Sequence, residues 1–370
     1  MKLEEYLLKV IKREETGLIP GLILIVLTIL AQVYRFLVYV RKKVYDLGVK
    51  KSYELDARVI SVGNITVGGT GKTPTVRKIA ANLTAAGHKV VVLSRGYKGD
   101  FADEIAVVSD GDSLAMSAQE AGDEPYLLAR FLDGVPVVVG SKRLKTGKYA
   151  CARFEPDFII LDDGFQHWQV ARDYDIVAID AVYPFGSEEL LPGGLLREPL
   201  SSLERAHKVV ITRADQVEEE ELAAIKDRVK EINSDLEIMV TRHQPTYLRD
   251  LVSGQCHEID LKGKRIMAVS GIGNPRSFEM TLEELGANIV KKIRYKDHHR
   301  YSDEEISRLF TLAAVHNVDK IVTTEKDAVS MDNEIIEVNN IGIDVQALGI
   351  ELGILEGREV WDDFLEVLER

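Results

Sequence analysis

The sequence predicts an α/β fold with a doubly wound, mostly parallel sheet. Three observations support this. Short β-branched runs alternate with helical stretches from residue 57 onward. Several runs are apolar throughout, which is typical of parallel strands covered by helices on both faces. Strand and helix alternate instead of forming separate blocks, which indicates the α/β class. The runs are Arg58–Val62, Lys89–Leu93, Val135–Val139, Phe158–Leu161, Ile176–Ile179, Lys208–Thr212, Arg265–Ser270 and Lys320–Thr324.

The length and the turn signals predict more than one domain. The chain has 370 residues, 45% of them hydrophobic and 29% charged, which is the profile of a folded globular protein. Pro245–Leu251 and Cys256–Leu261 predict a hairpin across a Ser-Gly turn, and a new α/β pattern follows it. We therefore expect an N-terminal membrane-associated helical segment at 1–50, a larger core at 51–245, and a smaller C-terminal α/β domain at 246–370 that begins with a β-ribbon linker.

Charge is distributed unevenly along the chain. The net charge is −13, yet residues 1–58 hold eleven Lys/Arg against seven Asp/Glu, so the remainder is strongly acidic. An acidic body argues against nucleic-acid binding, whereas a basic segment beside an apolar run favours anionic lipid. The two cysteines, Cys151 and Cys256, are not in a CxxC pair. A disulfide framework or a Cys-based zinc site is therefore not expected. We expect a reducing cytoplasmic setting instead.

An apolar run lies near the N-terminus. Leu22–Tyr34 is uncharged, and after Arg35 the run continues as Phe36–Val40 before the basic Arg41–Lys43. Thirteen residues are too few to span a bilayer comfortably, and nineteen including Arg35 are borderline. No small-residue cleavage site follows, which argues against a removable signal peptide. A helix buried in the core is one interpretation. The basic flanks and the tyrosines near one end favour a helix lying in or dipping into a membrane, and spanning stays open.

The most specific motif is the glycine-rich segment Thr66–Thr73, which follows the first strand run. Glycines let backbone N–H groups surround phosphate oxygens, Lys72 neutralises β/γ-phosphate charge, and the Thr73 hydroxyl can ligate Mg²⁺. A helix opening at Pro74 adds its N-terminal dipole. The usual GxxxxGK[ST] pattern has Gly where Thr66 stands here. The alternative interpretation is a glycine-rich turn that binds no phosphate. The order strand, loop and helix predicts a P-loop NTPase-like core whose nucleotide-binding residues are Thr66, Val67, Gly68, Gly69, Thr70, Gly71, Lys72 and Thr73.

A second acidic motif ends another strand run. Phe158–Leu161 is followed by Asp162 and Asp163. In P-loop enzymes an acidic residue at this place holds the Mg²⁺ shell, although Asp is also common simply where strands end. We expect Thr73, Asp162 and Asp163 to be the candidate metal ligands.

Five blocks in register resemble one known family. They run from Ser61 to Pro74, Leu93 to Tyr97, Glu120 to Pro125, Leu161 to His167 and Leu191 to Pro199, and together they closely resemble the tetraacyldisaccharide 4′-kinase family of the lipid A pathway. The similarity extends from the apolar N-terminal segment to about residue 330.

The resemblance implies an activity, cofactors and a location. The activity is transfer of the ATP γ-phosphate to the 4′-hydroxyl of tetraacyldisaccharide 1-phosphate with Mg²⁺, giving the 1,4′-bisphosphate lipid A precursor. The location is the cytoplasmic face of a bacterial inner membrane, to which the N-terminal segment attaches the enzyme. The implied partners are the lipid disaccharide and the membrane lipid surface, with no nucleic acid and no required protein partner.

The resemblance also implies roles for particular residues. Lys72 and Thr73 match the P-loop positions, Asp123 matches the proposed catalytic base, and His298 matches a histidine that supports this base. Because His299 and Arg300 follow directly, the assignment between His298 and His299 stays open. Asp162, Asp163 and His167 match a block that organises the metal and active site.

Basic residues in the family-like blocks are candidates for phosphate contact. Arg95, Arg143 and Arg197 could contact a substrate or ATP phosphate, or could be solvated surface residues in ordinary ion pairs. Glu124 could support the base, or could be the N-terminal acidic residue of a helix that begins near Pro125.

Other functional classes fit the sequence less well. A membrane-bound partitioning or regulatory ATPase often has a second Lys where Val67 stands. A GTPase needs a guanine-reading Asn-Lys-x-Asp, and Thr324–Asp327 lacks the Asn. Ser270–Asn274 is read as a plain turn because no GxGxxG continues it. In a non-catalytic nucleotide-binding module, Asp123 and His298 would have no evident function.

Overall fold

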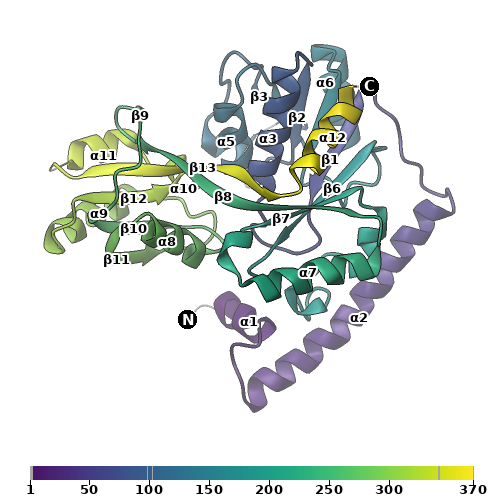
Figure 1. The fold of residues 1–370 in the computed structure, drawn as a ribbon, viewed down its shortest axis with the longest axis horizontal. Helices are drawn as coiled ribbons and strands as arrows, with labels where there is room; N and C mark the ends of the chain where they lie inside the picture. Colours follow the sequence, from purple (N-terminus) through teal and green to yellow (C-terminus); the bar gives the residue numbers. More distant parts are fainter. Residues whose placement is uncertain (1–2, 98, 102, 341, 370) are drawn as a thin grey trace. The chain divides into compact units, whose positions relative to one another are not determined.

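Segments that are far apart in the sequence assemble into two units. The computed structural model describes residues 3–97, 99–101, 103–340 and 342–369. Unit 1 comprises Met1–Leu93, Lys142–Arg242 and Ile354–Arg370, and unit 2 comprises Ser94–Ser141 and His243–Gly353. Figure 1 colours the chain along the sequence, so each unit contains several colours. The three-part domain division from the sequence stays a prediction.

The sheet of unit 1 confirms the predicted α/β class. Its strands pair in the order β8-β7-β6-β1-β5-β2, and all of these pairs are parallel. The strands are apolar and almost fully buried, as expected when helices cover both faces. Their bounds are β1 (Arg58–Gly63), β2 (Val90–Ser94), β5 (Phe158–Asp162), β6 (Tyr174–Asp180), β7 (Lys208–Thr212) and β8 (Glu237–Asp250), of which the first part of β8 belongs here.

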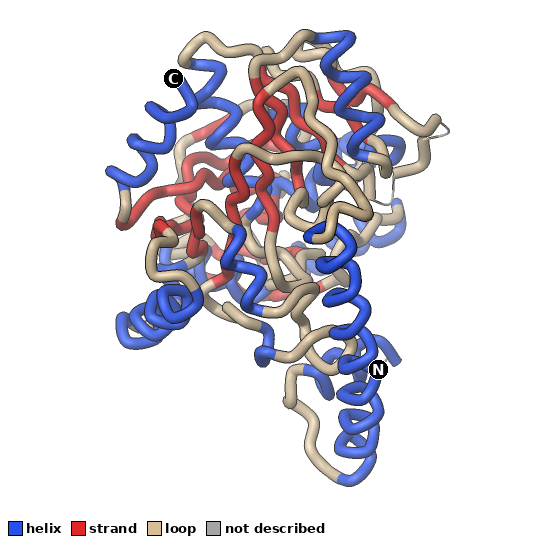
Figure 2. Tube along the Cα trace, turned by 90° about the vertical axis from the view of Figure 1, so that its right-hand side faces the viewer, coloured by secondary structure: helices blue, strands red, loops and turns tan. Residues whose placement is uncertain are grey.

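The register of this sheet aligns the carboxyl ends of its central strands. Val62 of β1 pairs with Asp162 of β5, and Gly63 pairs with Val177 of β6. The segments that follow β1 and β5 therefore leave the sheet at the same edge, where ligands bind in open α/β sheets. The long helices that flank these strands are α3 (Lys72–Ala85), α6 (Arg143–Phe154), α7 (Glu219–Ile232) and α12 (Arg358–Glu369), and Figure 2 shows helices in blue around strands in red.

The apolar N-terminal run forms one continuous helix. After α1 (Leu3–Ile11), α2 spans Leu18–Asp46, and by length and composition it could cross a membrane. Figure 1 shows α2 as the long purple helix at the edge of unit 1. Ala31 is its one buried residue, and most of its large apolar side chains are exposed. The interpretation of a helix buried in the core is therefore wrong.

One face of α2 nevertheless packs on unit 1. A Cβ added to Gly193 would lie 3.2 Å from both Ala31 Cβ and Thr28 Cα, so only glycine permits this approach without displacement. The Tyr34 hydroxyl donates to the Arg197 carbonyl at 2.9 Å. Farther along the helix, the Arg41 guanidinium donates to the Gln166 carbonyl at 2.7 Å. These contacts fix one side of α2 and leave the other side exposed.

In unit 2, the second part of β8 pairs with a further group of strands. The order is β11-β10-β12-β13-β8, and the β10-β11, β10-β12 and β12-β13 pairs are parallel. Strands β3 and β4 form an antiparallel pair. The strands are β3 (Ala106–Ser109), β4 (Val137–Val139), β9 (Cys256–His257), β10 (Arg265–Ser270), β11 (Asn288–Arg294), β12 (Lys320–Thr324) and β13 (Asp344–Glu356). The helices are α4 (Ala118–Ala121), α5 (Asp123–Phe131), α8 (Pro275–Glu284), α9 (Asp303–Val315), α10 (Glu325–Ala328) and α11 (Asn333–Asn339).

Several sequence boundaries need correction. The predicted hairpin exists, because Leu248 pairs with His257 and Arg249 with Cys256, but β9 ends at His257. The helix after the glycine-rich loop begins at Lys72 rather than at Pro74, since the backbone turns helical directly after Gly71. The run Val135–Val139 forms only the three-residue β4, paired antiparallel to β3.

Candidate active site

The glycine-rich loop has the backbone geometry of a phosphate-binding loop. It connects β1 to α3, and Gly71 precedes the first helical residue. Gly68 has φ +115° and Gly71 has φ +78°, a left-handed region that favours glycine. The first turn of α3 carries Lys72 and Thr73 beside unpaired backbone N–H groups, which together attract anions. The loop Thr66–Thr73 thus connects a strand to a helix as predicted, and nucleotide binding by its residues stays a prediction.

Buried side chains of unit 1 donate hydrogen bonds to the backbone carbonyls of this loop. The Thr212 hydroxyl donates to the Thr70 carbonyl at 3.0 Å, and the Arg213 guanidinium donates to the Gly69 carbonyl at 2.6 Å. Arg213 in turn donates through Nε to Asp180 Oδ1 at 2.8 Å. Sequence reasoning missed Arg213 and Asp180. Their positions at the carboxyl ends of two predicted strands were the available signal.

Asp163 lies between two cations of unit 1. Lys72 Nζ is 3.4 Å from its Oδ1, and Arg197 Nη1 donates to both carboxylate oxygens at 2.9 Å. Burial alone would raise the pKa of Asp163, but the charges of Lys72 and Arg197 outweigh it and lower the pKa below its ordinary value. Asp163 also adopts φ +54°, which is uncommon for a residue with a side chain. The structure thus brings together three residues that the sequence analysis assigned separately.

The oxygen donors at this edge suit Mg²⁺. Thr73 lies in the first turn of α3, and the buried Asp162 ends the neighbouring strand β5. Mg²⁺ is usually held by one or two protein oxygens together with substrate phosphates and waters. In the described residues, no group of three or more His, Cys, Asp or Glu could hold a metal by itself. Thr73 and Asp162 fit as ligands, while Asp163 is occupied by Lys72 and Arg197.

His167 lies in the turn that follows β5. Its backbone N–H donates to the Gly164 carbonyl at 2.8 Å, and its own carbonyl accepts from Arg172 at 3.0 Å. The imidazole is half-buried. A role of its side chain in the active site stays a prediction.

In unit 2, a histidine contacts the expected base. Asp123 is the first residue of α5, and His298 Nδ1 lies 3.1 Å from its Oδ2. Both side chains are largely buried. His298 has φ +58°, and its backbone N–H donates to the Gly271 carbonyl at 3.1 Å. Backbone strain of this kind is often found at functional positions.

The geometry also distinguishes the two adjacent histidines. His299 Nε2 lies 2.9 Å from Glu305 Oε2, and the His299 ring stacks on Tyr295 with 4.3 Å between centroids. His298, by contrast, contacts Asp123. The structure therefore brings His298 to the carboxylate.

The basic candidates occupy different surroundings. Arg95 is exposed in unit 2, whereas Arg143 is buried at the start of α6 in unit 1. Arg197 pairs with Asp163. Glu124 follows Asp123 in α5 and lies 3.4 Å from Lys326 Nζ, an acid partner for a lysine to which sequence reasoning gave no role.

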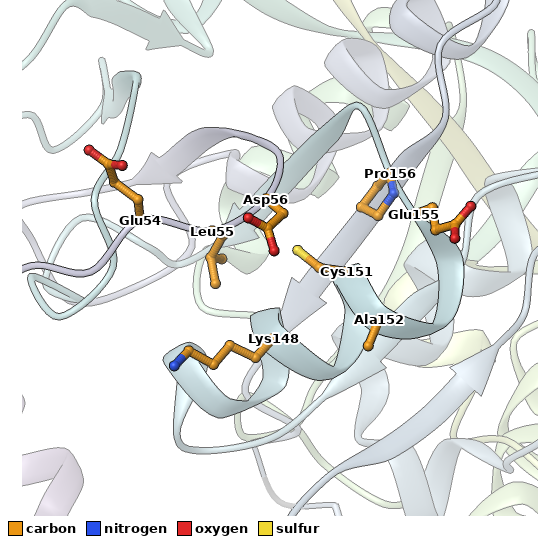
Figure 3. Close-up of a pocket in the computed structure, with 8 residues that line it drawn as sticks. All are labelled: Glu54, Leu55, Asp56, Lys148, Cys151, Ala152, Glu155 and Pro156. Atoms are coloured by element: carbon orange, nitrogen blue, oxygen red, sulfur yellow. The ribbon is translucent and has the colours of Figure 1, made fainter.

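A surface cavity of unit 1 includes none of these residues. It measures about 560 Å³ and is lined by Glu54, Leu55, Asp56, Lys148, Cys151, Ala152, Glu155 and Pro156 (Figure 3). Burial raises the pKa of the Cys151 thiol, which keeps it protonated and weakly nucleophilic. This cavity contains none of the candidate site residues.

Comparisons with known proteins converge on one family. The family model described as Tetraacyldisaccharide-1-P 4′-kinase matches residues 23–369. A tetraacyldisaccharide 4′-kinase of Halothermothrix orenii is 42% identical over 95% of each chain, and one of Elusimicrobium minutum is 38% identical over 92% of this chain and 90% of its own. A crystal structure of LpxK from Aquifex aeolicus in complex with ATP superposes with a TM-score of 0.72 at 30% identity, covering 92% of this chain and 97% of that one. This chain belongs to the tetraacyldisaccharide-1-P 4′-kinase family.

Proposed function

We propose that this chain is an ATP-dependent kinase that phosphorylates the 4′-hydroxyl of tetraacyldisaccharide 1-phosphate, giving the 1,4′-bisphosphate. The observation that carries the proposal is the contact between Asp123 and His298, in a chain that also carries the glycine-rich loop Thr66–Thr73 before α3. The matching family and the similar relatives are named as kinases of this lipid sugar, which disfavours the alternative of a partitioning or regulatory ATPase.

The P-loop residues bind the nucleotide phosphates. Backbone N–H groups of Thr66–Thr73 surround them, and Lys72 neutralises charge on the β- and γ-phosphates. Thr73 and Asp162 would hold Mg²⁺, which would further neutralise phosphate charge when bound. Asp163 pairs with Lys72 and Arg197 and thereby keeps both cations oriented at this edge of the sheet.

Asp123 acts as the general base. It accepts the proton of the attacking 4′-hydroxyl while the oxygen attacks the γ-phosphorus and ADP leaves. His298 donates a hydrogen bond to the carboxylate and so orients it, the arrangement of a base held by a further group. We assign phosphate contacts of the substrate or ATP to Arg95, Arg143 and Arg197 and a supporting role to His167.

The exposed face of α2 attaches the enzyme to the cytoplasmic face of the inner membrane. Leu22, Ile29 and Phe36 are among its exposed apolar residues, at 64%, 61% and 63% exposure. On the other face, Thr28, Ala31 and Tyr34 pack on unit 1. A helix with one face on protein and the other apolar suits burial in the interfacial plane rather than a crossing, and the basic Arg41–Lys43 suit anionic headgroups.

The test is product identification. Purified protein, ATP, Mg²⁺ and tetraacyldisaccharide 1-phosphate should give a lipid that carries one additional phosphate at the 4′ position, detected by fragmentation mass spectrometry. Lys72→Ala and Asp123→Ala proteins serve as controls and should give almost none. Phosphate at another hydroxyl, or an unmodified lipid with active nucleotide hydrolysis, would contradict the proposal.

A further inference from the structure

The segment Thr324–Asp327, which the sequence analysis left without a function, is fully engaged within unit 2. The Thr324 hydroxyl accepts from the Asp327 backbone N–H at 3.1 Å. Glu325 accepts a bidentate pair of hydrogen bonds from Arg249, the shortest at 2.6 Å. Asp327 accepts from the Gly271 backbone N–H at 2.8 Å and from the Tyr301 hydroxyl at 3.0 Å. These three residues bind the short helix α10 to its surroundings, and Lys326 belongs to the same helix.

Lys326 contacts the residues around the proposed base. Its Nζ lies 3.0 Å from Asp297 Oδ1, 3.2 Å from His298 Nε2 and 3.4 Å from Glu124 Oε1. Burial alone would lower the pKa of Lys326, but the charges and hydrogen bonds of Glu124 and Asp297 outweigh it and raise the pKa. The amine therefore stays an ammonium at neutral pH.

The ammonium decides which nitrogen of His298 carries the proton. An ammonium group has only donors and no acceptor, so a nitrogen at 3.2 Å must offer it a lone pair. With Lys326 as the donor, Nε2 of His298 would be the acceptor and the ring proton would lie on Nδ1. Nδ1 is the atom that lies 3.1 Å from Asp123 Oδ2, so it donates to the carboxylate.

The same segment also holds the backbone of His298. Asp327 binds the N–H of Gly271, and the carbonyl of Gly271 accepts from the His298 N–H at 3.1 Å. These bonds support the left-handed backbone of His298, whose φ is +58°. Asp327 therefore supports the histidine backbone, whereas Lys326 supports its ring.

We propose that Lys326 is a positioning residue that fixes His298 as the neutral tautomer with its proton on Nδ1. In this state the imidazole donates to Asp123 and leaves the carboxylate free to accept the substrate proton. Asp297 Oδ2, at 3.8 Å from His298 Nε2, would otherwise favour a second proton on the ring. Lys326 neutralises this effect. The consequence for turnover rests on the proposed kinase function, but the tautomer does not.

Removing the ammonium should change both the ring and the pH profile. In Lys326→Met, Asp123 and Asp297 remain and Glu124 loses its cation, so the His298 ring should carry a proton on Nε2 as well as on Nδ1. An imidazolium bound to Asp123 makes that carboxylate a weaker base. The acid limb of kcat/KM should therefore move to higher pH, and kcat at neutral pH should fall on the order of 10-fold while KM for ATP stays unchanged. Lys326→Arg should restore much of the activity.

The direct test is ¹⁵N NMR of the histidine side chains in the full chain without substrate. The His298 signals are identified by their loss in His298→Gln. The wild type should show a proton on Nδ1 only, and Lys326→Met should show Nε2 protonation. Lys292, which bridges Glu279 and Glu283 elsewhere in unit 2, supplies the control, and Lys292→Met should leave His298 and activity unchanged.

Two results would overturn the proposal: a proton on Nε2 in the wild type, or an unchanged Nδ1 tautomer in Lys326→Met. If Lys326→Met does not fold, the same NMR measurement on Lys326→Gln and on the wild type tests the proposal. A wild type with the expected tautomer that does not phosphorylate the lipid disaccharide would refute the kinase function and leave the tautomer assignment standing.

Discussion

His298 Nδ1 lies 3.1 Å from Asp123 Oδ2, although 175 positions separate the two residues in the chain. The carboxylate belongs to the first turn of α5, where the helix N-terminus stabilises its negative charge. The imidazole comes from the loop after β11. An oriented, ionised carboxylate of this kind is suited to accept a proton from a sugar hydroxyl.

Asp123→Asn should remove the base and keep the shape of the side chain. We expect kcat to fall by about 10²- to 10⁴-fold, the usual contribution of a general base. ATP affinity, measured by calorimetric titration, should change little because Asp123 is not in the P-loop. Asp112→Asn, at an exposed position of the same unit, should retain normal kcat. Equal losses of turnover and ATP binding in Asp123→Asn would remove Asp123 from the role of base.

The pairing of Asp163 with Lys72 and Arg197 should make stability depend on pH. The pKa of Asp163 in the folded state is lower than its unfolded value of about 3.8, so its contribution is fully present above that value. The contribution is lost as pH falls below about 3.8 towards the folded pKa. The difference in unfolding free energy between wild type and Asp163→Asn should therefore shrink below pH 4, as measured by urea unfolding at several pH values. A difference that stays constant from pH 6 to pH 3 would show that the ion pairs do not stabilise the fold.

Gly193 should tolerate no larger residue, because α2 packs directly on it. In Gly193→Val the new side chain meets Ala31 and the backbone of Thr28, and overpacking of this kind costs about 1–3 kcal/mol. Urea denaturation measures the loss. Gly21 lies in α2 itself with open space around it, so Gly21→Val should change stability little. Equal effects of the two substitutions would mean that α2 does not pack on Gly193 in solution.

Polar substitutions on the exposed face of α2 should release the protein from membranes. The combined change of Leu22, Ile29 and Phe36 to Ser removes apolar area that faces away from unit 1, so the fold should be retained. Co-sedimentation with vesicles that contain anionic lipid should fall strongly. Val315→Ser with Val338→Ser, at positions 70% and 82% exposed in unit 2, should leave sedimentation unchanged. Undiminished binding of the α2 variant would refute attachment through this face.

The central strands and the P-loop could be predicted from the sequence because local chemistry determines them. A run such as Phe158–Leu161 is apolar on both faces, which only a strand covered on both sides requires. The P-loop needs left-handed backbone at Gly68 and Gly71 followed by Lys72 and a hydroxyl, so its residues are recognisable in one segment.

Other elements carry weaker local signals. In β11 the half-buried Ile289 and Val290 are followed directly by Lys291 and the exposed Lys292, so the apolar run is short. The long β8 runs through Pro245, a residue that usually argues against a strand interior. The bounds of these two strands could therefore not be predicted from apolar runs. The composition of the two units from five segments depends on long-range contacts that no local pattern records.

The candidate site shows the same division between local and long-range information. Lys72 is recognisable from its immediate neighbours, but Lys326 meets Glu124 from 202 positions away. A lone Lys in a polar segment carries no signal of that contact. The resemblance to a family named Asp123 and His298, whereas only the structure shows the lysine on the far side of the histidine ring.

Transfer of labelled γ-phosphate tests the central claim most directly. ATP labelled at the γ position is incubated with wild type and with Asp123→Asn, each with tetraacyldisaccharide 1-phosphate or with the same sugar without acyl chains. We predict label in the acylated lipid, much less in the non-acylated sugar, and almost none with Asp123→Asn. Release of labelled inorganic phosphate without labelled lipid from the wild type would contradict the account, because it would make the protein an ATPase and not a lipid-sugar kinase.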